Sequence, residues 1–322
     1  MRLGVFLLAP RFPGQDTVAP LAAAVAAAVA AEAAGFDDVW VAEHHFMSYG
    51  GCPSAVTMAG YLLGATRRIA VGTAVSVLST THPVALAEQA ALLDRLSGGR
   101  FRLGVGRGGP WVELAVFGTG EERWERGYPA ALDELLTVLR TGRVREDLEL
   151  VPRARPDLPV ITAVTSEAGL RVAAERRLPM LLGMHADDEE KAALTARYAR
   201  LAPGAGPRHM SAGIAHVADT TAEAVATVRT AVPRWLGPGL AGYRRADGAP
   251  NSPRDPAAYT ELLCRLHPVG SPEHCTAVLA ATAERTGVDH VVLLVETTGE
   301  LPRTLETIAR LGAEVLPRLR SA

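Results

Sequence analysis

Lysine and cysteine are scarce in this chain of 322 residues, and each scarcity excludes a class of protein. Lys191 is the only lysine, so arginine carries almost all the positive charge, and the formal net charge is -2. A chain without a basic excess offers no electrostatic surface to nucleic acid or to an anionic membrane. The three cysteines lie far apart, without the spacing of a zinc site or of a disulfide framework, which indicates a reducing compartment.

Long uninterrupted apolar runs are also missing. The best candidate, Ala19–Ala34, contains Glu32, lacks a basic flank in front of it and is too short to span a bilayer. We therefore expect the first helix of a cytoplasmic protein here, rather than a signal peptide or an anchor. With 48% hydrophobic residues the chain can bury a large core, and its length fits one α/β barrel.

Apolar runs alternate with amphipathic stretches along the whole chain. Continuous apolar runs of this length are typical of parallel strands that are covered on both faces. Eight strand–helix units in strict alternation predict one α/β domain over residues 1–322, a (β/α)₈ TIM barrel. The expected strands are Leu3–Leu8, Val39–Ala42, Ile69–Val77, Phe101–Val105, Pro159–Val164, Met180–Gly183, Ser211–His216 and His290–Val295. The expected helices are Ala19–Ala34, Ser54–Thr66, Val84–Leu96, Arg126–Leu139, Glu167–Arg176, Asp188–Leu201, Thr221–Leu236, Pro272–Arg285 and Leu301–Leu319.

The stretch Gly237–Pro256 interrupts this pattern before the eighth strand. It is loaded with glycine, proline, aspartate and arginine, and it shows no periodicity. Because a connection of this length is uncommon inside a compact domain, we expect an irregular insertion that forms a mobile excursion near the active face.

Active sites of this fold lie at the carboxyl ends of the strands. The second expected strand ends in Glu43, His44 and His45. Adjacent residues of a strand point to opposite faces, so one histidine should face the barrel mouth and the other the helix layer or a partner subunit. Most lone histidines are structural, but the position and the neighbouring glutamate favour a site here. A metal site that includes His82 is the weaker alternative, because adjacent side chains diverge and later strands add no ligands.

A glycine cluster at residues 104–109 follows the fourth expected strand and formally matches G-x-G-x-x-G. Because Pro110 and Trp111 come next instead of a helix, the sequence does not favour dinucleotide binding. A better interpretation is a strand exit at which a ligand approaches the backbone and Arg107 holds a phosphate. Pairing of Arg107 with a carboxylate is an equal alternative.

Thr165 and Ser166 stand directly before an expected helix. Hydroxyls and free N–H groups at a helix N-terminus bind anions, although Ser166 could also be a simple N-cap. Together with Arg107 on the preceding strand exit, these residues predict a phosphate cradle. A phosphorylated cofactor would then lie across the barrel mouth.

In this order and at this spacing, the motifs resemble those of the bacterial luciferase family of flavin-dependent monooxygenases, and most closely those of the luciferase α subunit. The resemblance runs along nearly the whole chain. Individually the motifs are common, but together they are specific. They include Ala42-Glu43-His44-His45-Phe46, Thr81-His82-Pro83-Val84, Gly99-Arg100-Phe101, Arg107-Gly108 and Pro268-Val269-Gly270-Ser271-Pro272.

The resemblance implies a TIM barrel that binds reduced FMN, supplied by a separate flavin reductase, and reacts it with O₂ to a flavin hydroperoxide. His44 would be the catalytic imidazole that hydrogen-bonds the peroxide or moves a proton near neutral pH. No metal is implied. The residues implied to bind the cofactor are Glu43, Ala74, Val75, Gly106, Arg107, Gly108, Thr165 and Ser166.

The resemblance also implies two features of the chain and its assembly. The first is a non-proline cis peptide between Ala74 and Val75, and the second is a homodimer in which His45 faces Glu88 of the partner subunit.

Two departures weigh against light emission from a long-chain aldehyde. Gly106 stands where light-emitting luciferases have a reactive cysteine, and Thr165 where they have a glutamate.

The sequence thus predicts a two-component FMNH₂-dependent monooxygenase that hydroxylates or epoxidises an organic small molecule. Its arginine- and alanine-rich composition favours a role in natural-product biosynthesis. Two alternatives stay open. The first is an oxidoreductase of the same barrel family that uses a reduced deazaflavin for hydride transfer, and the second is a non-catalytic luciferase-like flavin-binding subunit, against which His44 argues.

Overall fold

The apolar runs of the sequence form parallel strands that close into a barrel. In the computed structural model, which describes residues 1–118, 122–206 and 208–321, neighbouring strands follow the order β3-β2-β1-β11-β8-β7-β6-β5-β4. Pairing of β3 with β5, through Val71 and Phe101, closes the sheet and confirms the predicted (β/α)₈ barrel. The strands are β1 (Arg2–Leu7), β2 (Asp38–Val41), β3 (Ala70–Thr73), β4 (Ser76–Val77), β5 (Phe101–Gly106), β6 (Val160–Val164), β7 (Met180–Leu182), β8 (Met210–Ile214) and β11 (His290–Leu294).

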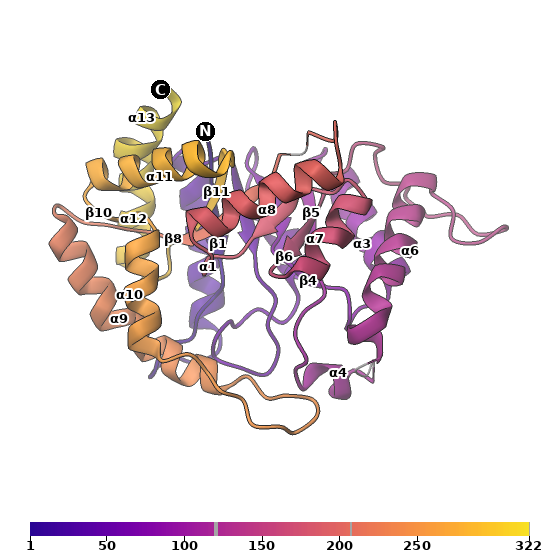
Figure 1. The fold of residues 1–322 in the computed structure, drawn as a ribbon, viewed down its shortest axis with the longest axis horizontal. Coiled ribbons are helices and arrows are strands. Elements are labelled where there is room, and N and C mark those ends of the chain that lie inside the picture. The colour runs from indigo at the N-terminus through magenta and orange to yellow at the C-terminus, as the bar shows by residue number, and fades with distance from the viewer. Residues whose placement is uncertain (119–121, 207, 322) are drawn as a thin grey trace.

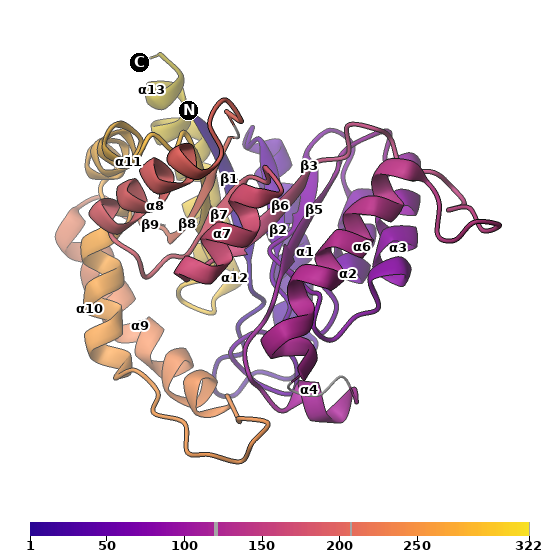
Figure 2. The same ribbon diagram turned by 45° about the vertical axis from the view of Figure 1, so that its right-hand side comes forward.

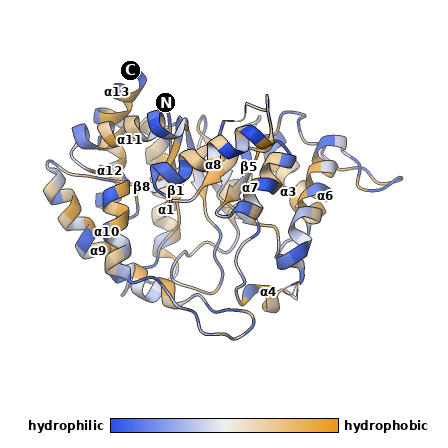
Figure 3. Ribbon diagram, viewed as in Figure 1, coloured by the Kyte–Doolittle hydropathy of each residue, from blue (hydrophilic) through white to orange (hydrophobic). Residues whose placement is uncertain are grey.

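Helices surround the sheet on its outer side (Figures 1 and 2). Figure 3 shows apolar strands in the centre and helices with both polar and apolar turns, as expected for helices that cover a sheet with one face. None of the described helices combines the length and hydrophobicity that a bilayer-spanning segment requires. The helices are α1 (Ala19–Ala33), α2 (Ala55–Ala65), α3 (Pro83–Leu96), α4 (Glu113–Val116), η1 (Arg123–Gly127), α6 (Tyr128–Thr141), α7 (Glu167–Glu175), α8 (Asp188–Leu201), α9 (Thr221–Ala241), α10 (Pro256–Leu266), α11 (Pro272–Thr286), α12 (Leu301–Arg310), η2 (Leu311–Val315) and α13 (Leu316–Ser321).

Two of the expected strands are divided. The run Ile69–Val77 is interrupted between β3 and β4, and the peptide bond between Ala74 and Val75 is cis, as predicted. The run Ser211–His216 ends as a barrel strand at Ile214. The chain then forms β9 (His216–Val217), which pairs with β10 (Val269–Gly270) in a separate two-stranded sheet.

The irregular insertion before the last barrel strand is shorter than predicted. Helix α9 continues through Pro233 and Pro238 and ends at Ala241, so the irregular part comprises residues 242–255. The expected helix Thr221–Leu236 already contained Pro233. Gly237 and Pro238 made the sequence pattern look broken where the helix persists, because both residues have low helix propensity and proline lacks an N–H donor. Mobility of this segment stays a prediction.

Helix α10, Pro256–Leu266, was not predicted from the sequence. It begins with proline at its first position, where the missing N–H costs nothing. Asp255 caps it by accepting a hydrogen bond from Ala258 N at 2.7 Å. The capping signal was present, but the surrounding proline and charged residues concealed it.

Alternate residues of β1 belong to two different cores. Leu3, Val5 and Leu7 pack under the outer helices. Phe6 and Leu8 belong to the second cluster, which fills the barrel interior together with Trp40, Leu181 and Val292. This period of two is the pattern that a barrel strand requires, and it leaves the carboxyl ends of the strands at the open mouth of the barrel.

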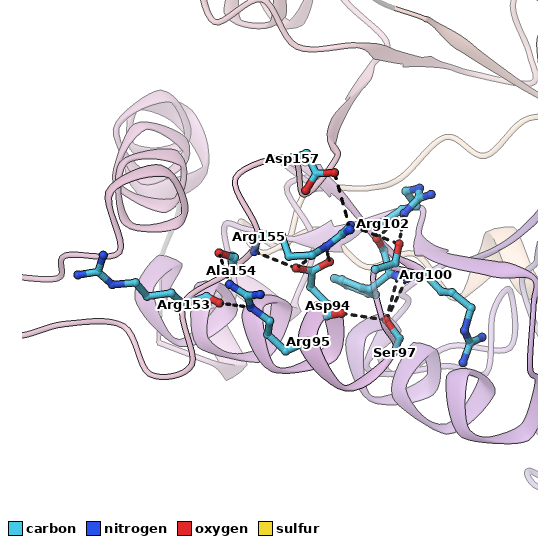
Figure 4. A network of polar contacts seen from close by, with 11 residues as sticks. Asp94, Arg95, Ser97, Arg100, Arg102, Arg153, Ala154, Arg155 and Asp157 are labelled. Atoms are coloured by element: carbon cyan, nitrogen blue, oxygen red, sulfur yellow. Dashed lines mark hydrogen bonds and ion pairs between the residues drawn. The ribbon is translucent and has the colours of Figure 1, made fainter.

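A polar network fixes the chain that enters β6 (Figure 4). The fully buried Asp94 of α3 accepts hydrogen bonds from Arg155 N and from Arg155 Nε, at 2.9 and 3.0 Å. Arg95 of the same helix donates to the carbonyl oxygens of Arg153 and Ala154. Because β6 starts five residues after Arg155, this network helps to set where the carboxyl end of β6 lies.

Candidate active site

The segments that follow the barrel strands gather at one end of the molecule. Both chain termini lie at the opposite end, whereas α4 and the segment between α9 and α10 lie at this one (Figure 1). Residues 43–54 after β2, residues 107–118 after β5 and the first turn of α7 therefore share the mouth at which this fold places its active sites.

The predicted phosphate cradle is a real cavity of about 320 Å³. A cavity of this size is within the range of small-molecule sites. It brings together six of the nine residues that the sequence assigned to catalysis and cofactor binding, and these are Val75, Gly106, Arg107, Gly108, Thr165 and Ser166. Ala74 lies beside it, packed against the cluster that fills the barrel interior.

Arg107 has an aromatic partner and not a carboxylate. Its guanidinium carbon lies 4.2 Å from the centroid of the Trp124 ring. Trp124 is itself held by a hydrogen bond of 2.9 Å from its Nε1 to Gly108 O. No ion pair of Arg107 is found among the described residues. The guanidinium edge therefore stays available to an anion, and the alternative of an Arg107–carboxylate pair is not observed.

Two glycines at the cradle are required by close packing. A Cβ on Gly106 would lie 2.5 Å from Val75 Cγ2, which is impossible without displacement. Gly108 has a φ of +73°, a conformation that favours glycine, and a Cβ there would lie 2.6 Å from Val77 Cγ1. The space that Gly106 leaves is thus taken by the Val75 side chain at the cis peptide.

Ser166 is the N-cap of α7, and its hydroxyl accepts a hydrogen bond from Gly169 N at 3.2 Å. The simple N-cap alternative is therefore correct for the geometry, but it does not exclude a ligand. A capping hydroxyl still has its own hydrogen to donate, and α7 directs its positive dipole end and free N–H groups at the same cavity.

His44 is placed apart from the cradle. It lines another cavity, of about 390 Å³, together with Arg11, Ser48 and Gly50. His44 N donates to Cys52 O at 2.9 Å, which folds the segment after β2 back on itself. A Cβ on Gly50 would lie 2.7 Å from His44 Nδ1, so glycine is needed for the imidazole to lie where it does.

The imidazole of His44 is neutral near pH 7. Burial lowers its pKa to about 4, and the nearby His45 lowers it further in the same direction. Neither ring nitrogen has a hydrogen-bond partner among the described residues. The group is thus a neutral imidazole that can accept or donate a hydrogen bond, and its expected role at the flavin peroxide stays a prediction.

Glu43 joins two elements. Its carboxylate accepts hydrogen bonds from Ala55 N at 2.9 Å and from Val77 N at 3.0 Å. These bonds tie the N-terminus of α2 to β4. Glu43 does not line the cradle. Through its two hydrogen bonds it holds the second and third strand exits together. Its assignment to the cofactor stays a prediction.

His45 has neighbours different from those of His44. Its ring packs edge-on against Phe117, with centroids 5.1 Å apart, while His44 packs against Tyr49 and Tyr243. His45 Nε2 is fully buried, lies 3.6 Å from Glu43 Oε1 and has no hydrogen-bond partner. The predicted divergence of the two imidazoles agrees with these contacts.

The weaker alternative of a metal site finds no ligand cluster. Within the ranges that the structure describes, no three His, Cys, Asp or Glu side chains are grouped to hold a metal ion. His82, which that alternative included, instead caps α3 by accepting a hydrogen bond from Val84 N at 3.2 Å.

One carboxylate at the barrel mouth escaped the sequence argument. Glu296 follows the last barrel strand, is buried, and accepts hydrogen bonds from Leu8 N and Ala9 N at 2.7 and 3.2 Å. Burial raises its pKa to about 7, against the two backbone hydrogen bonds that lower it. The rule that strand exits carry site residues applies to Glu296 as it does to Glu43, and it could have identified this residue.

Comparison with known proteins agrees with the fold. A family model for the luciferase-like monooxygenases matches residues 1–290. The alkanal monooxygenase alpha chain of the Kryptophanaron alfredi symbiont is 26% identical over 352 residues, which cover 99% of either chain. The crystal structure of monooxygenase RslO1 from Streptomyces bottropensis has a TM-score of 0.82 at 22% identity and 100% coverage of both chains. The oxygenating constituent of 3,6-diketocamphane monooxygenase from Pseudomonas putida, in complex with FMN, has a TM-score of 0.77 at 18% identity and 98% coverage of both chains.

Proposed function

This chain belongs to the luciferase-like monooxygenase family, and on that premise we propose that it is the oxygenating component of a two-component, FMN-dependent monooxygenase. It takes reduced FMN from a separate flavin reductase and uses O₂ to hydroxylate or epoxidise an organic small molecule. The observation that carries the proposal is the cavity at Arg107, Thr165 and Ser166.

The residues of this cavity fit the phosphate of FMN. Arg107 offers a planar fork of donors that Trp124 holds from one face. Ser166, Thr165 and the first turn of α7 offer hydroxyl and N–H donors together with the positive end of the helix dipole. When bound, reduced FMN supplies the electrons that activate O₂. The protein's own part is to hold the phosphate and to shape the mouth with Val75 and Gly106.

We assign His44 the handling of a proton or hydrogen bond at the reacting centre. Its ring nitrogens have no hydrogen-bond partner in the part of the chain that the structure describes, and the imidazole is neutral near pH 7 because burial lowers its pKa to about 4. A neutral imidazole can accept a proton at one nitrogen and donate a hydrogen bond from the other. Gly50 and Cys52 support this position by packing against the ring and by pairing with the backbone.

We further propose a cytoplasmic homodimer in which His45 lies near the interface. Several large apolar side chains around α2, α3 and α4 are exposed, which is typical of a surface that another subunit covers. They are Phe46, Leu92, Leu96, Val116 and Phe117. The contact that we propose between His45 and Glu88 of the partner subunit is supported by the exposure of Glu88 on α3 and by the exposed rings of Phe46 and Phe117, against which His45 packs. Sedimentation of a monomer at micromolar concentration would contradict the dimer.

The cofactor assignment is tested by comparing three flavins. Anaerobic titrations with reduced FMN, reduced riboflavin and a reduced deazaflavin should show the tightest binding for FMN. Replacement Arg107→Ala removes a charge-assisted contact of about 1.5–3 kcal/mol, so FMN binding should weaken roughly 10- to 100-fold. Riboflavin binding should hardly change, because riboflavin has no phosphate.

Arg140→Ala on α6 is the matched control, because it removes an exposed arginine outside the cavity. Equal losses for FMN and riboflavin in Arg107→Ala would remove the phosphate assignment. Tighter binding of the deazaflavin would favour the alternative of hydride transfer.

The oxygenase itself is tested by adding air to the FMNH₂ complex. Reoxidation of the flavin as fast as in free solution, with no product from any organic acceptor, would contradict it.

A natural-product role rests on composition alone. The arginine- and alanine-rich sequence supports this placement, and product analysis with the partner reductase would test it.

A further inference from the structure

Aromatic side chains are few in this protein, yet five of them meet at the barrel mouth. Only 5% of the residues are aromatic. The five that meet come from separate segments and make one continuous series of ring contacts, which we call the aromatic wall. Its members are Phe12, Tyr49, Trp111, Trp235 and Tyr243.

Tyr49 and Tyr243 form the centre of the wall. The Tyr49 ring stacks on Trp235 with centroids 5.1 Å apart and lies 5.4 Å from Tyr243. Tyr243 in turn lies 4.8 Å from Trp111. The proposed catalytic imidazole, His44, packs edge-on against Tyr49 at 5.0 Å and against Tyr243 at 6.3 Å. The wall is therefore continuous with the site at which we place proton handling.

The protein holds Tyr49 in place from behind. Trp235 Nε1 donates a hydrogen bond to Tyr49 O at 2.9 Å. A Cβ on Gly239 would lie 3.1 Å from Tyr49 Cα, so α9 approaches the Tyr49 backbone closely at this glycine. A ring fixed in this way loses little conformational entropy when a ligand binds to it.

The segment 242–255, which carries Tyr243, is fastened to the segment after β5, which carries Trp111. Trp111 forms an antiparallel bridge with Arg245. Two backbone hydrogen bonds flank this bridge, from Val112 N to Arg244 O at 2.8 Å and from Ala246 N to Pro110 O at 2.9 Å. The two rings are thus set side by side by main-chain pairing, independently of what binds to them.

The hydroxyls of the wall are free to bind a ligand. Tyr49 and Tyr243 are half-buried, and neither hydroxyl has a hydrogen-bond partner among the described residues. Neither oxygen is sealed from solvent, unlike the unpaired hydroxyl of Tyr198 elsewhere in the chain. Buried Tyr128, by contrast, pairs with Thr162 at 2.7 Å. Burial raises the pKa values of Tyr49 and Tyr243, so both hydroxyls keep their hydrogens as donors.

We propose that the partly exposed members of the aromatic wall, Tyr49, Trp111 and Tyr243, bind the organic substrate, and that this substrate is a flat aromatic ring system with an oxygen substituent. The buried Phe12 and Trp235 support these rings from behind. Offset and edge-to-face ring contacts favour an aromatic ligand by about 0.5–1.5 kcal/mol per pair beyond its buried area. The Tyr49 and Tyr243 hydroxyls donate to the oxygen of the ligand. The proposal rests on the proposed function only in that it calls this ligand the substrate.

Binding without turnover tests the wall. The full-length chain, without flavin, is titrated calorimetrically with 2-naphthol and with 2-decalol, its saturated and non-planar analogue. The same titrations are made with Tyr243→Leu, Tyr243→Phe and Trp111→Leu. Tyr61→Leu is the matched control, because Tyr61 is an exposed tyrosine of α2 and is not part of the wall.

We expect 2-naphthol to bind about tenfold more tightly than 2-decalol, in line with one to two ring contacts. Tyr243→Leu and Trp111→Leu should each weaken 2-naphthol about tenfold, while Tyr243→Phe keeps most of the affinity and Tyr61→Leu keeps all of it. Equal affinities of the two probes for the wild-type chain, or no 2-naphthol binding, would overturn the proposal even if a variant failed to fold. Wild-type affinity in both leucine variants would overturn it as well.

These outcomes are separate from those of the flavin titrations. Normal 2-naphthol binding in a chain that does not bind FMN would contradict the proposed monooxygenase function but not the proposed binding of aromatic ligands at the wall. Normal FMN binding in a chain that does not distinguish 2-naphthol from 2-decalol would contradict the proposed binding of aromatic ligands at the wall but not the proposed monooxygenase function.

Discussion

Glu296 is a carboxylic acid whose charge depends on its surroundings. Removal from water favours the protonated form, whereas the N–H groups of Leu8 and Ala9 favour the carboxylate. The first effect is the larger, and the pKa is raised to about 7. Glu296 therefore titrates near neutral pH at the carboxyl end of the last strand, while His44, at the end of the second, does not.

Replacement Glu296→Gln should remove a pH dependence of stability. Because the folded pKa lies above the ordinary value of 4.5, Glu296 adds stability that is fully present below about pH 4.5 and is lost as the pH rises through about 7. Glutamine does not titrate. Urea unfolding at acidic and at alkaline pH measures the free energy of unfolding of both proteins. The value of the variant should increase relative to that of the wild type, on the order of 1–3 kcal/mol, as the pH rises. Parallel pH profiles of the two proteins would contradict this, and the exposed Glu284→Gln is the control.

The residues of the cradle could be predicted from the sequence, but those of the wall could not. Arg107 and Ser166 follow strands directly, so the general rule for barrels points to them. Tyr243 and Trp111 become neighbours only through the pairing of two irregular segments that are far apart in the chain. No local pattern reports such a contact. Glu296 also follows a strand, so the same rule could have identified it.

At the scale of elements, α3 depends on one buried acid. Asp94 is fully buried and pairs with Arg155, and it also binds the Arg155 backbone (Figure 4). Asp94→Ala leaves the backbone N–H of Arg155 without its partner, and it leaves the Arg155 side chain with only Asp157 and Gly99 O. Because a polar group that loses its hydrogen-bond partner costs about 1–3 kcal/mol, we expect a loss of that size in the free energy of unfolding.

Urea denaturation of Asp94→Ala beside Glu149→Ala measures this loss. Glu149 forms an ion pair with Arg153 that is exposed on both sides, so its removal should cost about 1 kcal/mol or less. Similar values for the two variants would show that the network of α3 is no more important than a surface pair.

Most elements followed from periodicity, and the exceptions have identifiable causes. Alternating apolar and amphipathic runs placed all eight barrel strands, because parallel strands and covering helices differ in their hydrophobic period. Helix α10 and the end of α9 were missed, since proline at positions 238 and 256 reads as a break in a single sequence. Tertiary packing of α9 against α10 overrides that local preference.

At the scale of the molecule, four buried histidines make the fold sensitive to acid. Burial lowers the pKa of His44, His209 and His216 to about 4, and that of His267 to about 3. Each is neutral in the folded protein at a pH at which the unfolded chain already binds a proton. A depressed histidine pKa contributes stability that is present above about pH 6.5 and is lost as the pH falls.

We therefore expect the free energy of unfolding to decrease as the pH falls from about 6.5 to about 4.5. Glu296 acts in the opposite direction over this range, but it offsets only one of the four histidines. Chemical denaturation over this range measures the slope, and His209→Gln should reduce it while exposed His82→Gln leaves it unchanged. Constant or increasing stability toward acid would contradict the burial of neutral imidazoles.

The four tryptophans lie in three different parts of the barrel. Trp40 is sealed in the interior beside Asp38. Trp124 covers the guanidinium of Arg107, and Trp111 and Trp235 belong to the wall. Indole emission responds to nearby charge and polarity, so the molecule contains its own optical probes. The emission of Trp124 reports an anion that reaches Arg107, that of Trp111 and Trp235 reports an occupied wall, and Trp40 provides the constant background against which both are measured.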